Sequence, residues 1–253
     1  GYRLVGSEMC IRDSFKTLLI ISKPKLENIL KNTCGNIVDL SQPLVKNIFM
    51  DNKIEQFKNI KGFLDHAEGE FLYELARTYC KKSFAVEIGS YCGKSACYIA
   101  AGCKQNNRVL ISIDHHKGSE EQQFGQEYFD PKLYDEETKS INTFPHFQAT
   151  VKKFRFTETI IPLVMTSQSA SKILSNNIDL IFIDGSHTFE SARNDYQLWN
   201  QKLNNTGILA IHDIYDTEAE GGQAPKEIYE KAISEGFILI DRVKSLVALQ
   251  RST

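Results

Sequence analysis

The chain has 253 residues, of which 42% are hydrophobic and 25% are charged, and its formal net charge is −2. These values are typical of a globular protein with room for one large α/β domain, and they favour neither nucleic acid nor an anionic membrane as a partner. No apolar run in the sequence is long enough to cross a bilayer. Six cysteines without a C-x-x-C pair indicate reduced thiols in a cytoplasmic protein.

The first 61 residues differ in pattern from the remainder of the chain. Residues 1–14 look like a translated sequencing-adapter tail, and we predict that this stretch is not native and lies outside the fold. Residues 15–61 have a loosely helical pattern broken by prolines and a glycine, which predicts a helical extension. The main domain is therefore expected over residues 62–253.

Strands and helices alternate along this main domain. The expected strands are Phe84–Ile88, Val109–Asp114, Ile160–Met165, Asp179–Asp184, Gly207–Ile211, Phe237–Ile240 and Leu246–Leu249. One expected helix follows residues 62–70 and another begins at Lys94. A third covers Ile141–Phe154, with an interruption at Pro145. Further helices are expected over Ser169–Leu174, Glu190–Leu203 and Pro225–Ser234. Because the central strands are apolar on both faces, we expect an α/β fold, a doubly wound, mostly parallel sheet of seven strands that ends in a hairpin.

A glycine turn joins the strand Phe84–Ile88 to the helix that begins at Lys94. Such a turn brings backbone N–H groups and the positive end of a helix dipole close to a ligand, here between Gly89 and Gly93. Glu87 adds an acceptor suited to a ligand amine or hydroxyl. The third glycine of the dinucleotide-binding fingerprint is missing, which argues against a nicotinamide cofactor.

Ligands of an open parallel sheet bind outside the carboxyl ends of its strands, so the polar residues there are candidates for a site. Asp114 ends the second strand, where a carboxylate can accept both hydroxyls of a ribose or can serve as a turn or cap residue. Of His115 and His116, at most one is expected to face the site, because adjacent side chains point apart. Ser167 and Gln168 follow the third strand and suit either a ligand or a helix N-cap.

Two further strand ends carry acids and histidines. Asp184 ends a buried strand, where a carboxylate is costly unless it is paired, hydrogen-bonded or bound to a metal. Three residues later, His187 suits a general base, and a metal-ligand role is also open. His212 and Asp213 end the fifth strand as metal ligands or as residues that contact substrate directly. Two polar loops, residues 117–131 and 216–223, are expected to flank the same mouth as a lid or substrate wall.

The turn resembles the S-adenosylmethionine (SAM) loop of class I methyltransferases, most closely the E-[IL]-G-x-Y-x-G-x-S form of catechol and caffeoyl-CoA O-methyltransferases. The resemblance runs from about Gly62 to Arg251 and includes the order of the seven strands. It implies a SAM site in which successive residues hold the methionine end, the ribose and the adenine. These residues are Glu87, Gly89 and Gly93, then Asp114, then Ser167 and Gln168.

The same resemblance bears on a metal. In the catechol-type enzymes the aspartate that matches Asp184 binds Mg²⁺, and a base follows three positions later, where this chain has His187. Asp213 matches the second metal aspartate, but Ile214 replaces the asparagine that is the third ligand. His212 is a substitute ligand that favours Mn²⁺, Fe²⁺ or Zn²⁺ over Mg²⁺, and a site without metal stays open. The I-D-G-x-H and H-D patterns also recur in methyltransferase family 24.

These features lead to the hypothesis of a SAM-dependent methyltransferase that acts on a hydroxyl of a small molecule, such as a sugar or another polyhydroxylated metabolite. A divalent metal and a homo-oligomer are left open. The alternatives are a nicotinamide-dependent oxidoreductase and a non-catalytic module that binds SAM or a metal.

Overall fold

The computed structural model of the protein describes residues 53–126 and 128–252. The sheet and its helices form one compact unit from Gln56 onward. The predicted tail, residues 1–14, and most of the predicted helical extension, residues 15–61, lie outside the described residues. No helix in the described part of the chain is both long and apolar enough to cross a membrane.

The sheet has seven strands in the order β5-β2-β1-β6-β7-β9-β8. The strands are β1 (Ala85–Ile88), β2 (Leu110–Asp114), β5 (Ile160–Val164), β6 (Ile178–Ile183), β7 (Leu203–Ile211), β8 (Phe237–Val243) and β9 (Leu246–Arg251). All neighbouring pairs from β5 to β7 are parallel, whereas β9 runs antiparallel to both β7 and β8. A separate two-stranded ribbon joins β3 (Tyr134–Asp135) to β4 (Ser140–Ile141). The predicted mostly parallel sheet with a terminal hairpin is confirmed.

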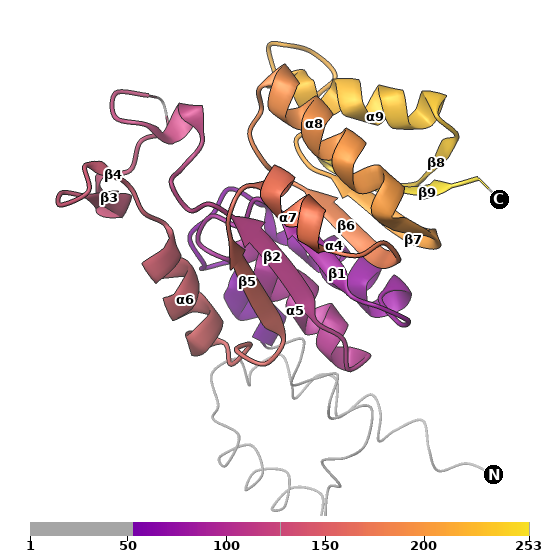
Figure 1. Ribbon diagram of the computed structural model, residues 1–253, viewed down its shortest axis with the longest axis horizontal. Helices are drawn as coiled ribbons and strands as arrows, with labels where there is room; N and C mark the ends of the chain where they lie inside the picture. Colours follow the sequence, from indigo (N-terminus) through magenta and orange to yellow (C-terminus); the bar gives the residue numbers. More distant parts are fainter. Residues whose placement is uncertain (1–52, 127, 253) are drawn as a thin grey trace, which may run out of the picture. The chain divides into compact units, whose positions relative to one another are not determined.

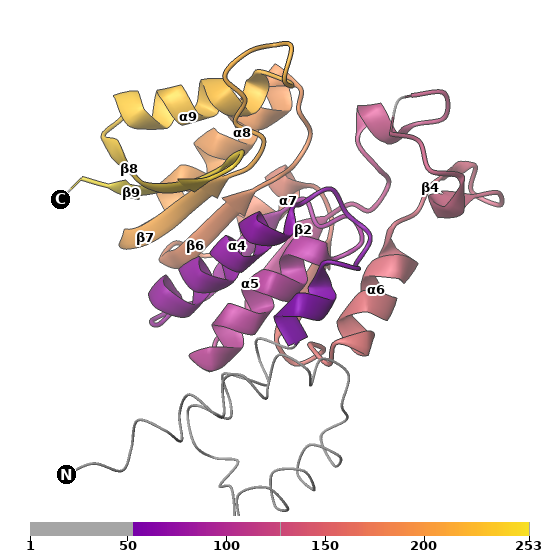
Figure 2. The ribbon, with the colours of Figure 1, turned by 180° about the vertical axis from the view of Figure 1, so that it is seen from behind.

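Helices cover both faces of the sheet (Figures 1 and 2). On one face lie α4 (His66–Tyr79) and α5 (Lys94–Gln105), and on the other lie α7 (Ser167–Ile173), α8 (Phe189–Trp199) and α9 (Ala224–Ser234). Helix α6 (Phe144–Lys153) and the 3-10 turns η1 (Glu120–Gln122), η2 (Pro131–Leu133) and η3 (Asn200–Lys202) also belong to the domain. This two-sided cover is the doubly wound arrangement that the sequence predicts.

Helix α6 begins later than the sequence pattern suggests. The predicted helix from Ile141, interrupted at Pro145, is wrong at its start, because Ile141 belongs to β4 and Thr143 is the N-cap of α6. Pro145 lies in the first turn, where the missing N–H needs no partner inside the helix and the fixed φ of proline suits helical geometry. The proline therefore marks the beginning of the helix.

Alternation along β1 decides which side chains face which helices. Val86 and Ile88 belong to a buried apolar cluster that includes Trp199 and Tyr196 of α8. Because successive side chains of a strand point to opposite faces, Glu87 lies on the other side of the sheet, toward α5. All four residues of β1 are buried, so the carboxyl group of Glu87 is inside the protein.

The turn after β1 touches the turn after β6. The N–H of Gly89 donates to the carbonyl of Ile113 at 2.9 Å, and the N–H of Asp184 donates to the carbonyl of Ile88 at 2.9 Å. Gly89 has φ of +88°, and a Cβ at this position would lie 2.0 Å from the carbonyl oxygen of Asp184. Only glycine permits this approach, which holds the two turns at one place.

We expect Gly89→Ala to lower the free energy of unfolding by at least about 2 kcal/mol, because left-handed strain adds to a backbone clash. Urea denaturation measures the change. Gly125→Ala is the matched control, since Gly125 also has a positive φ (+83°) but open space around its Cβ position, and only about 1 kcal/mol is expected there. Equal losses in the two variants would contradict the role of the close approach.

Candidate functional site

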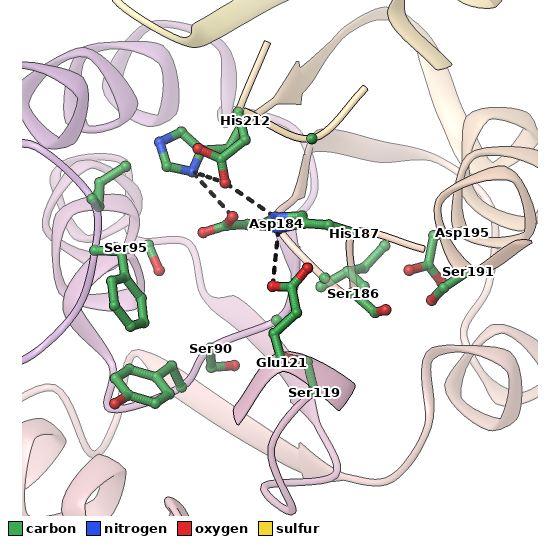
Figure 3. Close-up of a pocket in the computed structure, with 18 of the residues that line it drawn as sticks. Ser90, Ser95, Ser119, Glu121, Asp184, Ser186, His187, Ser191, Asp195 and His212 are labelled. Atoms are coloured by element: carbon green, nitrogen blue, oxygen red, sulfur yellow. Dashed lines mark hydrogen bonds and ion pairs between the residues drawn. The ribbon is translucent and has the colours of Figure 1, made fainter. Parts of the chain in front are cut away.

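A cavity of about 1550 Å³ opens at the carboxyl ends of the parallel strands. Residues at or just after the carboxyl ends of all five parallel strands line it, among them Gly89, Asp114, Gln168, Asp184 and Asp213. Sites for one small molecule usually measure about 300–1,000 Å³, so this cavity has room for two ligands side by side. Figure 3 shows its interior, with a cluster of acidic and histidine side chains on one side.

Asp114 fixes the glycine turn. Its Oδ2 accepts hydrogen bonds from the N–H groups of Ser90 and Tyr91, both at 2.9 Å, and its Oδ1 accepts one from the N–H of His116 at 2.7 Å. The carboxylate also lines the cavity. Asp114 therefore stabilises the turn. Its carboxylate oxygens can accept further hydrogen bonds, so its contact with the hydroxyls of a ribose stays a prediction.

Only one of the two histidines after Asp114 faces the cavity, as predicted. His115 lines the cavity. His116 is buried, its Nδ1 lies 2.7 Å from Oγ1 of Thr143, and burial lowers the pKa of its imidazole. Only His115 is placed to meet a ligand.

Glu87 and Gly93 do not line the cavity, unlike Gly89. Glu87 is fully buried, its Oε2 accepts from Oγ of Ser112 at 2.6 Å, and its Oε1 has no hydrogen-bond partner. Burial raises the pKa of this carboxyl group to about 7. Direct contact of Glu87 with a ligand is not supported by this placement. Ser95, in the first turn of α5, lines the cavity instead, and the last letter of the E-[IL]-G-x-Y-x-G-x-S pattern was the signal for it.

The segment after β5 caps helix α7 and also lines the cavity. Thr166 caps α7, with its Oγ1 accepting from the N–H of Ser169 at 3.2 Å. Ser167 and Gln168 both line the cavity. Oγ of Ser167 already accepts from Nε1 of Trp199 at 2.7 Å, which ties it to α8. The predicted contact of Ser167 and Gln168 with adenine stays a prediction.

Asp184, His212 and Asp213 converge at one point of the cavity. Figure 3 shows Asp184 and His212 beside each other there. Nδ1 of His212 lies 3.1 Å from Oδ1 of Asp184 and 3.5 Å from Oδ2 of Asp213. One potential ligand atom from each residue lies within 4.8 Å of the others. Two carboxylates and one imidazole form a donor set that suits Mn²⁺, Fe²⁺ or Zn²⁺, so these residues fit the predicted metal. Ile214 is buried and offers no side-chain ligand.

His187 adjoins this cluster. Its Nε2 lies 3.0 Å from Oδ2 of Asp213, and its Nδ1 lies 3.5 Å from Oε2 of Glu121. The hydrogen bond with Asp213 raises the pKa of His187, with help from the charges of Asp184 and Glu121 and against the effect of burial. Burial raises the pKa of Asp213, but hydrogen bonds from His187 and His212 outweigh it and hold that pKa well below its usual range.

Glu68, which the sequence analysis did not single out, completes the cluster from helix α4. It is buried, and its Oε2 lies 3.1 Å from Nε2 of His212. Burial lowers the pKa of His212, but the neighbouring carboxylates raise it well above its usual value. In the sequence, the spacing of Asp65 and Glu68 is only that of a helix capping box, and 144 residues separate Glu68 from His212.

The two polar loops face the cavity as expected. In the loop of residues 117–131, Glu120 accepts from Oγ of Ser186 at 2.9 Å and Glu121 contacts His187, so η1 rests against the turn after β6. Several residues of the loop 216–223 also line the cavity. Both loops are therefore walls of the site.

Comparison with protein families explains this combination of fold and site. Residues 86–214, half of the chain, match the model of a methyltransferase-domain family, methyltransferase family 24. The chain belongs to this family, which confirms the prediction of a class I SAM-dependent methyltransferase domain. The alternative of a nicotinamide-dependent oxidoreductase is thereby set aside.

One relative is the uncharacterized protein R132 of Acanthamoeba polyphaga mimivirus. It is 27% identical over 160 residues, which make up 63% of this chain and 64% of the relative. This chain thus matches less than two thirds of that protein's length.

Several solved structures share the fold. The O-methyltransferase NovP has a TM-score of 0.62 at 13% identity, over 82% of this chain and all of NovP (100%). The SAH-bound methyltransferase PaMTH1 of Podospora anserina has a TM-score of 0.56 at 13% identity, over 87% of this chain and 100% of its own. The O-methyltransferase TomG of Streptomyces achromogenes, solved with SAM, has a TM-score of 0.53 at 12% identity, over 92% and 100%.

Proposed function

We propose that the protein transfers a methyl group from SAM to a hydroxyl oxygen of a small molecule, assisted by a divalent metal. The observation that supports this proposal best is the convergence of Asp184, His212, Asp213 and His187 beside the cavity that Gly89 lines. The methyl acceptor must lose a proton, and acids with histidines are the groups that bind a cation or accept that proton.

The glycine turn and the next two strand ends are the proposed SAM site. SAM supplies a methyl group on a positively charged sulfur. The backbone of Gly89 and the side chains of Ser95, Asp114 and Gln168 line the part of the cavity that would hold it. Two solved structures of the same fold support this assignment, since TomG contains SAM and PaMTH1 contains SAH.

A metal bound by Asp184, His212 and Asp213 would supply positive charge that acidifies a coordinated hydroxyl. His187 is the proposed base. Since the pKa of Asp213 is low, its Oδ2 is an acceptor and Nε2 of His187 carries the proton. Nδ1 is then the nitrogen that accepts the substrate proton, and Asp213 stabilises the imidazolium that forms.

The proposed acceptor is a polyhydroxylated metabolite such as a sugar. The two loops line the cavity with carboxylates and amides that accept hydrogen bonds from hydroxyl groups, including Glu120, Gln122, Gln126, Glu218 and Glu220. NovP and TomG, which share the fold, are O-methyltransferases, and this favours an oxygen as acceptor.

We also infer a cytoplasmic location. Cys80, Cys92, Cys97 and Cys103 are free thiols, and the Sγ atoms of Cys80 and Cys103 lie 3.7 Å apart without a bond. Unbonded neighbouring thiols suit a reducing compartment.

The function is tested with methyl-labelled SAM, a panel of sugars and other polyols, and added Mn²⁺ or Mg²⁺. We expect labelled product in which the methyl group is bound to oxygen, a loss of turnover after chelation, and recovery with one divalent ion, while calorimetry shows SAH binding throughout. Turnover that survives exhaustive chelation would remove the metal from the proposal. SAH binding with no turnover on any acceptor of the panel would favour a non-catalytic module.

His187→Ala should reduce kcat by about 10² to 10⁴-fold if His187 is the base, because the reaction loses its proton acceptor. Single-turnover measurement with saturating substrates gives this number. SAH affinity and metal content serve as controls, and both should stay close to the values of the unaltered protein. Full activity in the variant would exclude His187 from proton transfer, whereas loss of bound metal would make it a ligand.

Glu121→Gln should shift the rising limb of the pH–rate profile to lower pH. The base works when neutral, so activity rises with pH through the pKa of His187, which nearby carboxylates raise. Removing one of these charges lowers that pKa by up to about one unit, the equivalent of ~1 kcal/mol of Coulomb energy in a solvated site.

Glu120→Gln is the matched control for this shift, because Glu120 belongs to the same turn but its carboxylate contacts Ser186. The control should move the profile less than Glu121→Gln does. A shift to higher pH in Glu121→Gln would contradict the assignment of His187 as the group that titrates.

A further inference from the structure

Glu68 has more contacts than a helix cap requires. Its Oε2 accepts from the N–H of Asp65 at 3.1 Å, which is the capping-box bond of α4. Its Oε1 accepts from the N–H of Ser245 at 2.9 Å and from Oγ of Ser245 at 2.7 Å. The fourth contact joins Oε2 to Nε2 of His212 at 3.1 Å, and both side chains of this pair are about 95% buried.

These contacts determine which atom of His212 carries a proton. Both oxygens of Glu68 face backbone N–H groups, from Asp65 and Ser245, so the carboxylate acts as acceptor on both sides. The imidazole nitrogen beside it must therefore be a donor, which places a proton on Nε2 of His212. The other ring nitrogen, Nδ1, points to Asp184 and Asp213. A histidine ligates a metal through its unprotonated nitrogen, and the partner of the opposite N–H fixes both tautomer and ring orientation.

We propose that Glu68 is the positioning residue of the metal site: by accepting the Nε2 proton of His212, it presents Nδ1 to an ion held together with Asp184 and Asp213. This inference rests on the metal in the proposed function. Glu68 lines the cavity but does not belong to the group of three residues whose ligand atoms converge, so in this proposal it acts through His212.

The rival explanation is that Glu68 only ties α4 to the turn between β8 and β9. Glu68→Gln separates the two. The amide of glutamine keeps the size of the side chain, but one of its two ends is an NH₂ group. That group must face N–H donors, either of Asp65 and His212 or of Ser245. His212 can relieve that conflict by moving its proton to Nδ1, which is the atom the ion needs.

The experiment titrates the full chain with Mn²⁺ and follows free Mn²⁺ by electron paramagnetic resonance. We expect one tight site in the unaltered protein and about 10- to 100-fold weaker binding in Glu68→Gln, the usual effect of losing such a partner. SAH affinity, measured by calorimetry, should stay within about twofold, which shows that the cavity is still formed.

Asp65→Ala is the control for the cap. Asp65 accepts the N–H of Ala67 at 2.8 Å, so its loss weakens the start of α4 and leaves the contact between Glu68 and His212 in place. We expect a lower melting temperature with unchanged Mn²⁺ affinity. Equal weakening of Mn²⁺ binding in Asp65→Ala and Glu68→Gln would show that Glu68 is only a structural tie.

A second measurement needs no variant. With ¹⁵N-labelled histidine and diamagnetic Zn²⁺, NMR should show His212 protonated at Nε2 and ligated at Nδ1; ligation at Nε2 would overturn the proposal. If the unaltered protein binds no Mn²⁺, the metal itself is lost from the proposed function together with this inference. If it binds Mn²⁺ and Glu68→Gln binds it equally well, only the role of Glu68 fails.

Discussion

A buried imidazole among three carboxylates is the interaction on which the site depends. His212 lies between Glu68 on one side and Asp184 and Asp213 on the other, and it is about 95% buried. Like charges so close together in a shielded place repel strongly unless a positive group separates them. The neighbouring carboxylates favour the protonated imidazole and raise the pKa of His212 well above its usual value, against the effect of burial. In the proposed metal site, a divalent ion would take the place of the Nδ1 proton and add to the compensation.

The backbone makes this convergence possible. β1, β6 and β7 are parallel neighbours, so their carboxyl ends lie at one edge of the sheet. Gly89 allows the turns after β1 and β6 to touch, and the hydrogen bonds that Asp114 accepts stabilise the glycine turn. The acidic and histidine side chains therefore meet because strand ends meet.

Local pattern in the sequence was sufficient for the sheet, the strand ends and the group Asp184, His187, His212 and Asp213. These residues follow strands whose apolar runs are unmistakable, and parallel pairing brings such ends together. The pattern did not foresee Glu68, because its link to His212 spans 144 residues and its local spacing is that of a helix cap. It also did not foresee the start of α6, where Pro145 opens the helix. Tertiary contacts decided both cases.

Glu87 and Ser167 show a different limit. Their residue types suit a ligand, yet both also contact neighbours in the fold. The strand turns Glu87 inward toward Ser112, whereas Ser167 lines the cavity while its Oγ accepts a hydrogen bond from Nε1 of Trp199. A sequence motif gives the place of a side chain along the chain, but only packing decides which of its polar atoms stay available.

The bonds from Ser245 to Glu68 have a consequence for how the molecule is made. They join positions 177 residues apart and connect the turn between the last two strands to the helix before the first. During synthesis, α4 leaves the ribosome long before the hairpin of β8 and β9. The contact between Ser245 and Glu68 can therefore form only after almost the whole chain has been made. The carboxylate of Glu68, and with it the buried pair of Glu68 and His212, thus gains its last hydrogen bonds only when the C-terminal hairpin is in place.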